Sequence, residues 1–242
     1  MIKFIFLLLI ILIFIVNNCY IDNFSNIEFD IHVINLDKDI KRWNIIKNNA
    51  KKQNLNITRF SAINGNTIDL SIYDHYFSNN NLKKGQKGCS LSHIKLWQNL
   101  IRHNNKYILI LEDDAIIPKN FTSKLKYYMN QLPSNWDMMI CGGNNFKGRR
   151  YSKNLIRPVI HPGGNWGTYA YLIKTSTAEK LLKVCKNMNT TIDNFLNYNF
   201  YSKHNVYFCV PQLIKHDFDA YSNIEQNIRS KDKNHKNTTK II

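Results

Sequence analysis

Residues 107–118 read YILILEDDAIIP, and this stretch constrains the fold more than any other part of the chain. An unbroken run of five apolar or aromatic residues leads directly into Glu112, Asp113 and Asp114. A run without polar alternation is typical of a strand covered on both faces, as in the middle of a parallel α/β sheet. Ligands of such sheets lie beyond the carboxyl ends of the strands, so we expect the three acids to face a ligand site.

The flanking segments alternate between strand and helix patterns, which predicts an α/β fold. We expect strands at 28–36, 57–63, 107–112, 136–143, 167–173 and 206–210, and helices at 37–53, 121–132 and 178–186. A further helix is expected after Gly88, with the apolar stripe Leu91, Ile94, Trp97 and Ile101. Asp37 has the character of a helix N-cap, and Ser176 with Glu179 has the spacing of a capping box. The basic stretch 147–157 is predicted to be a loop.

The length of 242 residues and the 44% hydrophobic content allow one substantial core. We therefore expect one globular domain over residues 28–228, with a basic, disordered tail at 229–242. The formal charge is +16. It is spread through loops rich in Lys and Asn, and the densest basic stretches lack the interleaved aromatic residues of a stacking surface. No nucleic-acid partner is expected.

The N-terminus carries an apolar run, Ile2–Val16, interrupted only by Lys3. Its length of roughly fifteen residues is below the roughly twenty that a spanning helix usually needs. No Ala-x-Ala-like cleavage site follows, so residues 1–20 are predicted to be a signal-anchor or a signal peptide. A lysine before the run and acids after it predict a body on the lumenal or outer side, either membrane-tethered or in the secretory-pathway lumen.

The cysteines occur singly and never form a Cys-x-x-Cys pair. They are Cys19, Cys89, Cys141, Cys185 and Cys209. This pattern predicts no cysteine zinc site. Their odd number argues against a complete disulfide framework, although one bridge in an oxidising lumen stays open.

Eight segments, in this order, resemble glycosyltransferase family 25, which contains lipopolysaccharide-type galactosyltransferases and collagen β-galactosyltransferases. They are INLDKDIKRW (34–43), RFSAINGNTI (59–68), LKKGQKGCSLSHIKLW (82–97), ILILEDDAI (108–116), WDMMICGG (136–143), GTYAYLIKTSTAEKLL (167–182), TIDNFL (191–196) and VPQLIKHDFDAYSNI (210–224). The resemblance implies a GT-A-like nucleotide-binding fold with a mostly parallel central sheet flanked by helices. It also implies a nucleotide-sugar donor such as a UDP-hexose, a divalent metal, usually manganese, and inversion at the anomeric carbon.

Sugar transfer from a nucleoside diphosphate must stabilise negative charge on the leaving diphosphate, and a hard divalent cation with oxygen ligands does this. Glu112 and Asp114 are two residues apart in extended chain, so their carboxylates point to the same side and could serve metal and ribose jointly. Asp114 is the predicted direct metal ligand, with Glu112 and Asp113 supporting it. The alternative is a solvated turn. His216 matches a segment from which GT-A enzymes often supply a further metal or diphosphate ligand; the alternative is a surface histidine.

The resemblance also assigns residues to catalysis and to the nucleotide. An inverting transfer needs a base for the acceptor hydroxyl, and Asp193 matches the family's Asp in its segment. Asp193 as a helix N-cap is the alternative, and the two roles are compatible. Asn35, Asp37 and Arg42 match the nucleotide-side motif, where backbone would hold the uracil and Arg42 the diphosphate or a structural carboxylate. The alternative for Asp37 is a role as a helix N-cap alone.

The expected function is metal-dependent, inverting transfer of a hexose from a UDP-sugar to a saccharide or hydroxylysine-type acceptor. Galactose is the first candidate for the hexose. A metal-dependent hydrolase is one alternative, and it needs a second cluster of His and Asp ligands for its water. The other is a degenerate transferase acting as a basic binding protein. Gln86 favours it, because the family's usual Gly-Glu-x-Gly-Cys reads Gly-Gln-Lys-Gly-Cys at residues 85–89.

Overall fold

The computed structural model describes residues 28–78, 81–102, 107–161 and 164–217, with short strands at 221–222, 227–228 and 240–241. The predicted leader at 1–20 lies outside these residues, and so does the predicted tail at 229–242 apart from 240–241. Among the helices of the described part, none combines the length and apolar character needed to cross a membrane. The predictions for the two ends of the chain therefore stay predictions.

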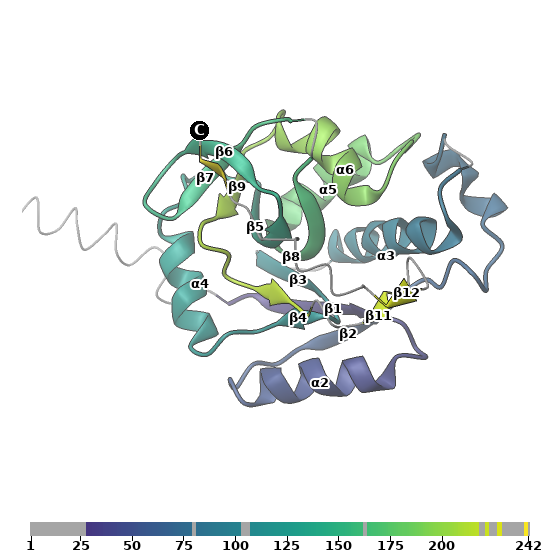
Figure 1. Ribbon diagram of the computed structural model, residues 1–242, viewed down its shortest axis with the longest axis horizontal. Coiled ribbons are helices and arrows are strands. Elements are labelled where there is room, and N and C mark those ends of the chain that lie inside the picture. The colour runs from purple at the N-terminus through teal and green to yellow at the C-terminus, as the bar shows by residue number, and fades with distance from the viewer. Residues whose placement is uncertain are drawn as a thin grey trace, which may run out of the picture.

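Within the described residues, a nine-stranded central sheet has the order β13-β6-β7-β9-β5-β8-β3-β1-β2 (Figure 1). Its strands are β1 (Asp30–Asn35), β2 (Thr58–Ser61), β3 (Tyr107–Glu112), β5 (Met138–Asn144), β6 (Lys147–Arg150), β7 (Leu155–Pro158), β8 (Trp166–Lys174), β9 (Val206–Cys209) and β13 (Lys240–Ile241). Two short antiparallel pairs lie outside it: β4 (Ala115–Ile116) with β10 (Lys215–His216), and β11 (Tyr221–Ser222) with β12 (Asn227–Ile228).

The sheet is mixed. Strands β2, β1 and β3 run parallel to one another, and β9 runs parallel to β5. Strand β8 lies between β3 and β5 and runs antiparallel to both. Parallel neighbours need a long crossover connection, usually a helix. No helix separates β5 from β8 in the described chain, which agrees with their antiparallel pairing. The α/β fold is confirmed, but the sheet is mixed and not mostly parallel as we expected.

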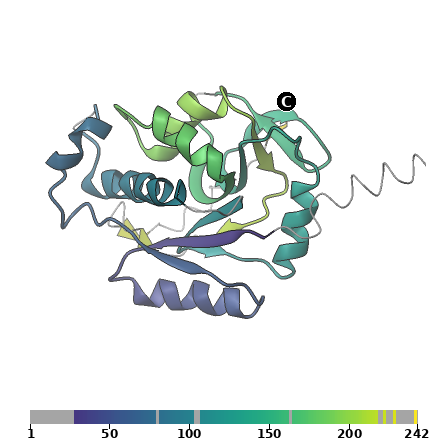
Figure 2. The same cartoon turned by 180° about the vertical axis from the view of Figure 1, so that it is seen from behind.

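Helices cover both faces of the sheet (Figures 1 and 2). They are α2 (Ile40–Lys51), α3 (Lys84–Leu100), α4 (Phe121–Met129), α5 (Thr175–Val184) and α6 (Ile192–Leu196), with a 3₁₀ turn at Ser71–Tyr76 and a π-helical turn at Asn197–Tyr201. Helices α3, α5 and α6 pack on one face and form the first hydrophobic core with it. Helices α2 and α4 pack on the other face and form the second core.

Strand β3 shows why its sequence has no polar alternation. Ile108 and Ile110 point into the core under α3, whereas Leu109 and Leu111 point into the core under α2 and α4. All four side chains are fully buried. Because successive side chains of a strand face opposite sides, both sets must be apolar when both faces are covered. The prediction of a doubly buried strand ending at Glu112 is confirmed.

Three local predictions are wrong. The expected loop 147–157 is a hairpin of β6 and β7, in which Arg149 pairs with Arg157. The basic side chains of Arg149 and Arg157 are exposed, and each of the two strands has a neighbouring strand on both sides. Helix α2 begins after Asp39, so Asp37 is not its N-cap. Helix α5 begins at Thr175, directly after β8, so Ser176 lies inside the helix.

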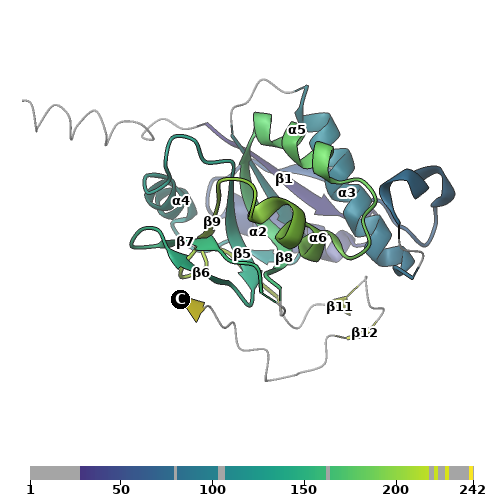
Figure 3. The same cartoon turned by 90° about the horizontal axis from the view of Figure 1, so that it is seen from above.

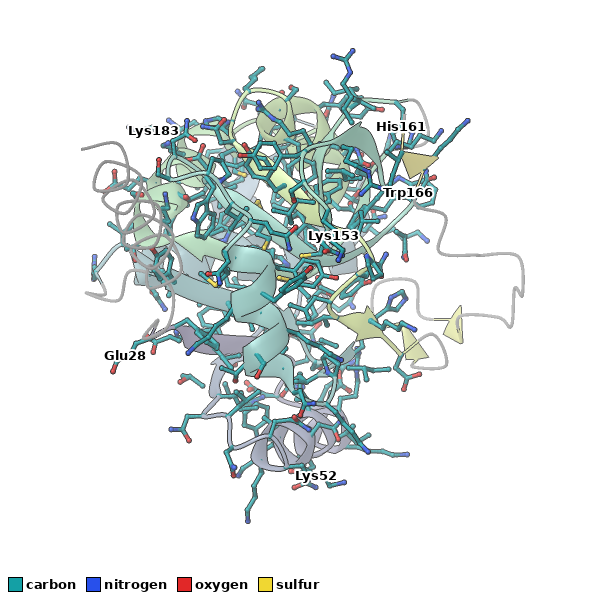
Figure 4. The ribbon with its side chains drawn as sticks, turned by 90° about the vertical axis from the view of Figure 1, so that its left-hand side faces the viewer. Glu28, Lys52, Lys153, His161, Trp166 and Lys183 are labelled. Carbon is teal, nitrogen blue, oxygen red and sulfur yellow. The ribbon has the colours of Figure 1, made fainter. Side chains whose placement is uncertain are left out.

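The last described strand, β13, adds to the far edge of the sheet beside β6 (Figure 3). Basic side chains are distributed widely over the surface. Lys52 follows α2, Lys153 lies in the β6–β7 turn and Lys183 lies on α5, and the three occupy separate regions (Figure 4). This distribution matches the interpretation that the positive charge is general rather than a single patch.

Candidate functional site

A pocket opens where the parallel strands β1, β2 and β3 end, as expected for a sheet of this type. Its walls are the ends of β1 and β3, the loop 62–66 after β2, and the first half of α3. Glu112, Asp113, Asp114 and Arg42 all line it. Counted out to open solvent, the space is about 730 Å³.

Asp113 is the most tightly held of the three acids. Its Oδ2 accepts a hydrogen bond of 2.7 Å from Asn35 Nδ2, and its Oδ1 lies 2.7 Å from a guanidinium nitrogen of Arg42. Asn35 is 1% exposed and Asp113 8%. The structure therefore joins three predicted site residues in one buried cluster, with Asp113 acting as an anchor for Arg42.

Burial raises the pKa of Asp113 to about 6, while Arg42 and Asn35 act in the opposite direction. The native state thus holds the Asp113 proton more tightly than the unfolded chain. The contribution of Asp113 to the free energy of unfolding is therefore greatest below its unfolded pKa of about 4. It falls as the pH rises to about 6, by at most about 3 kcal/mol.

We expect this slope between pH 4 and pH 6 to disappear in an Asp113→Asn protein, which has no proton to lose. Urea unfolding of both proteins across pH 4–8 measures the difference. The control is Asp74→Asn, which makes the same change at an exposed position and should keep the wild-type slope. An Asp113→Asn protein with the full slope would show that another group causes it.

Asp114 lies at the junction of two chain segments. Its Oδ2 is 3.3 Å from Arg42, and its backbone oxygen accepts a hydrogen bond of 2.9 Å from the N–H of Asp217. Next to this bond, the pairing of β10 with β4 sets His216 opposite Ala115. His216 is buried and packs against Tyr169, with ring centroids 4.7 Å apart. The structure therefore places His216 beside the acidic segment and not on the open surface.

A buried hydrogen-bond chain reaches Glu112 from α3 and β8. Trp97 Nε1 donates to Tyr171 Oη at 2.9 Å, and Tyr171 Oη lies 2.8 Å from His93 Nδ1. His93 Nε2 is 3.4 Å from Glu112 Oε1, which also accepts from Thr168 Oγ1 at 3.1 Å. Because His93, Trp97 and Tyr171 are fully buried, this chain fixes the Glu112 carboxylate at the pocket wall.

Sequence reasoning missed His93, although it lies one helical turn from Cys89 and one from Trp97 on the same face of α3. Ser92 Oγ donates to the oxygen of Gly88 and accepts from the N–H of Ile63. Its hydroxyl therefore fastens α3 to the loop 62–66.

Arg59 is a second residue that sequence reasoning missed. Its Nε donates to Asn35 Oδ1 at 2.7 Å, which turns the amide nitrogen of Asn35 towards Asp113. The same guanidinium pairs with Asp37 at 2.6 Å, and Ser61 also donates to that carboxylate. Asp37 is exposed and lies outside the pocket lining. The structure thus places Asp37 in the outer support of Asn35 and not against the pocket.

Asp193 lies in the first turn of α6, after Thr191 at the N-cap. Its Oδ2 accepts from the N–H of Gly167, and its Oδ1 accepts from Thr191 Oγ1 and the N–H of Asn194. These bonds tie α6 to the start of β8. The negative charges of Asp193, Glu112 and Asp114 all act on Cys89 in the pocket wall, so Asp193 belongs to the same neighbourhood as the acids of β3.

Gln86 has a local structural role at the start of α3. Its Oε1 accepts a hydrogen bond of 2.9 Å from the N–H of Lys83, which satisfies a donor at the helix N-terminus. Gly85 and Cys89 line the pocket, whereas Gln86 does not. A glutamate here would accept the same bond, so the amide does not remove a carboxylate from the pocket.

We expect Gln86→Glu to change the rate of any sugar transfer by less than about twofold and to stabilise the fold by about 0.5 kcal/mol, because a negative charge is favourable at a helix N-terminus. Urea unfolding and a transfer assay measure the two effects. Gln86→Ala, which removes the acceptor, should lose stability instead. A tenfold faster Gln86→Glu protein would instead assign catalysis to this position.

Two glycines allow α3 to approach the loop after β2. A Cβ at Gly88 would lie 2.6 Å from the backbone N of Gly65 and 2.6 Å from the oxygen of Ile63. A Cβ at Gly65 would overlap the backbone oxygen of Lys84. The pocket wall is therefore a direct backbone-to-backbone contact, which places Cys89 and His93 opposite the end of β3.

The donor set of the pocket fits a hard divalent cation. Glu112, Asp113 and Asp114 contribute three negative charges to the pocket lining, and Arg42 and Lys38 contribute two positive charges, so the lining has a net negative charge of one. Carboxylate oxygens are the ligands that manganese and magnesium prefer. The cluster is thus complementary in charge and ligand type to one divalent cation.

The fold and the site define an α/β protein with an acidic ligand pocket at the carboxyl ends of its parallel strands. Residues 29–162 match the family model of glycosyltransferase family 25 (LPS biosynthesis protein), which is 134 of 242 residues. The chain belongs to glycosyltransferase family 25. The resemblance read from the ordered motifs is confirmed.

Individual relatives share modest identity with the chain. It is 28% identical over 148 residues to procollagen galactosyltransferase 1 of Danio rerio, covering 58% of this chain and 24% of that protein. It is also 28% identical over 127 residues to inactive glycosyltransferase 25 family member 3 of Homo sapiens, covering 50% of this chain and 21% of that protein. The chain thus spans about a quarter or less of the length of these two relatives.

Solved structures with a similar fold include two glycosyltransferases. One is a glycosyltransferase involved in the glycosylation of the major capsid of PBCV-1, with a TM-score of 0.45 and 9% identity over 82% of this chain and 97% of that one. The other is GlyE of Streptococcus pneumoniae, with a TM-score of 0.44 and 13% identity over 82% of this chain and 57% of that one. These similarities concern the fold alone.

Proposed function

We propose that this protein transfers a hexose from a UDP-sugar to a saccharide or hydroxylysine-type acceptor, and galactose is the first candidate for the hexose. The transfer would invert the anomeric carbon and use manganese as cofactor. The observation that carries the proposal is the cluster of Glu112, Asp113 and Asp114 with Arg42 at the end of β3. Membership of glycosyltransferase family 25 supports the reaction class. The name of the Danio rerio relative supports galactose as the first sugar to test.

The residues divide between donor and acceptor. Glu112 and Asp114 would hold the metal, with His216 beside them, and the metal would offset the charge that grows on the leaving diphosphate. Asp113 and Asn35 fix Arg42, which stays available to the diphosphate from the pocket wall. Asp193, held by α6, would take the proton of the acceptor hydroxyl as the new glycosidic bond forms.

The test is a screen of UDP-hexoses with the full chain and manganese, measured as release of UDP with and without acceptor. An Asp193→Asn protein should bind UDP and manganese like the wild type in calorimetry, yet transfer about 10²- to 10³-fold more slowly. Asp69→Asn is the matched control, because Asp69 also accepts a hydrogen bond from a neighbouring backbone N–H but at an exposed site. Undiminished transfer by Asp193→Asn would remove Asp193 as the base.

A second candidate is a degenerate transferase that binds its ligands without turning them over. The observation in its favour is that relatives at comparable identity, such as the Homo sapiens protein, are described as inactive. The same calorimetry separates the candidates. Binding of UDP with manganese, and no hydrolysis or transfer of any UDP-hexose, would establish this second candidate, whereas the absence of both binding and turnover would reject both.

A further inference from the structure

Cys89 and His93 lie in the pocket wall, and the proposed sugar transfer assigns neither of them to the metal, the donor or the acceptor. They are four residues apart on α3 and therefore project from the same face of the helix. Glu112 reaches them from the end of β3. One ligand atom from each of the three residues lies within 4.8 Å of the others. Among the described residues, Asp114 and His216 do not belong to this group.

The spacing suits one small tetrahedral ion. Zinc holds imidazole nitrogen and carboxylate oxygen at about 2.0–2.2 Å, so two such ligands at a tetrahedral angle stand about 3.4 Å apart. His93 Nε2 and Glu112 Oε1 are 3.4 Å apart, which equals this separation. The sulfur of Cys89 would have to move towards the other two ligand atoms by at most about 1 Å, which a rotation of its side chain can supply.

The ligand types select a softer metal than manganese. Thiolate and imidazole favour zinc, whereas manganese and magnesium favour all-oxygen sites. Histidine ligands of metals donate their second ring N–H to a fixed acceptor. Here His93 Nδ1 lies 2.8 Å from Tyr171 Oη, and this oxygen, which accepts from Trp97, has a second lone pair. The imidazole is therefore already oriented with Nε2 towards the pocket.

Charge and access also favour a cation. Burial raises the pKa of the Cys89 thiol, and the negative charges of Glu112, Asp193 and Asp114 raise it further. All three ligand residues line the pocket, so a fourth coordination position would be open to water or to a bound ligand. Three protein ligands and one open position is the arrangement of an accessible zinc site, in contrast to a closed structural one.

We propose that Cys89, His93 and Glu112 form a binding site for a borderline-soft divalent cation, Zn²⁺, separate in ligand chemistry from the oxygen site of Asp114. Metal binding forms bonds to sulfur, nitrogen and oxygen, and the thiol proton of Cys89 leaves to solvent. The inference goes beyond sugar transfer and does not depend on it. Because Glu112 would serve both sites, zinc binding should also oppose manganese-dependent turnover.

Cobalt(II) titration of the full chain is the direct test, because a cobalt–thiolate bond gives a charge-transfer absorption that oxygen and nitrogen ligands do not give. We expect one equivalent of cobalt with this absorption, and its displacement by one equivalent of zinc. Cys89→Ser should lose the absorption and bind zinc at least about 100-fold more weakly, since removing even an outer-shell partner costs 10- to 100-fold. Tyr171→Phe should weaken zinc binding by about tenfold and keep the absorption.

Matched controls keep the test decisive. Cys19→Ser makes the same change at a cysteine outside the described residues, and His75→Ala removes an exposed histidine; both should bind like the wild type. Thermal unfolding of each variant excludes a loss of binding through unfolding. Unchanged zinc affinity in folded Cys89→Ser, or cobalt binding without the thiolate absorption in the wild type, would overturn the site. Manganese-dependent transfer could fail while this result stands, because the titration involves no sugar.

Discussion

Replacing Asp114 with Asn is expected to reduce manganese-dependent release of UDP from a UDP-hexose by about 10³-fold, which corresponds to about 4 kcal/mol of transition-state stabilisation. The reason is charge. Asp114 is 8% exposed and lines the pocket beside Glu112, so the amide preserves the shape of the site while the site loses one negative charge. Steady-state assays over a range of manganese concentrations measure the loss.

The control is Glu179→Gln, which neutralises an exposed carboxylate on α5 and should leave the rate unchanged. Calorimetry should show that Asp114→Asn binds manganese more weakly in the presence of UDP. Wild-type turnover by a folded Asp114→Asn protein would contradict the assignment of Asp114 as the metal ligand. The family membership of the chain would be unaffected.

Gly88→Ala is expected to have the largest effect on stability, with a loss of about 3 kcal/mol or more. The added methyl group would lie 2.6 Å from two backbone atoms of the loop 62–66, Gly65 N and Ile63 O. Neither atom belongs to a flexible side chain, so α3 and the loop must separate. Urea unfolding measures the loss, and the melting temperature provides a second measurement.

Ser90→Ala is the control for Gly88→Ala, because it places alanine on the same helix and removes only a hydrogen bond from Ser90 Oγ to the oxygen of Gln86. Its expected change is within about 1 kcal/mol. The pocket should respond with the fold. A Gly88→Ala protein that unfolds like the wild type would show that the contact between the loop and α3 can relax without loss.

The sequence predicted the centre of the fold because there the local pattern and the tertiary structure agree. The run 107–112 is buried on both faces, and its apolar character required that. The end of the strand also predicted that Asp113 and Asp114 would border a ligand pocket, whereas His216 entered only through family resemblance, as a ligand role that stays a prediction. Pairing of β10 with β4 brings His216 there from a hundred residues away, which no local pattern specifies.

Other features depended on interactions that a single segment does not reveal. The hairpin of β6 and β7 has a basic sequence, and its strands are defined by backbone pairing such as that of Arg149 with Arg157. The direction of β8 follows from the absence of a helix between it and β5 in the described chain. Strand-like composition alone cannot specify direction, because both orientations bury the same side chains.

The site shows the same limit. Cysteine spacing argued against a zinc site, but that rule concerns pairs of cysteines close in sequence. The rule does not detect a site made of one cysteine, one histidine four residues later and one acid on a strand. Such a site is visible only once the positions of β3 and α3 relative to each other are known. Arg59 escaped for a related reason, since its contact with Asn35 depends on β2 lying beside β1.

Arg42 gives the acidic cluster a resident counterion. Its guanidinium touches both Asp113 and Asp114, so it offsets the mutual repulsion of these carboxylates. We therefore expect the protein to fold without a bound metal. On the proposed function with manganese as cofactor, a cell short of the ion would keep the same amount of folded protein while turnover fell, and supplying the ion would restore turnover without new synthesis.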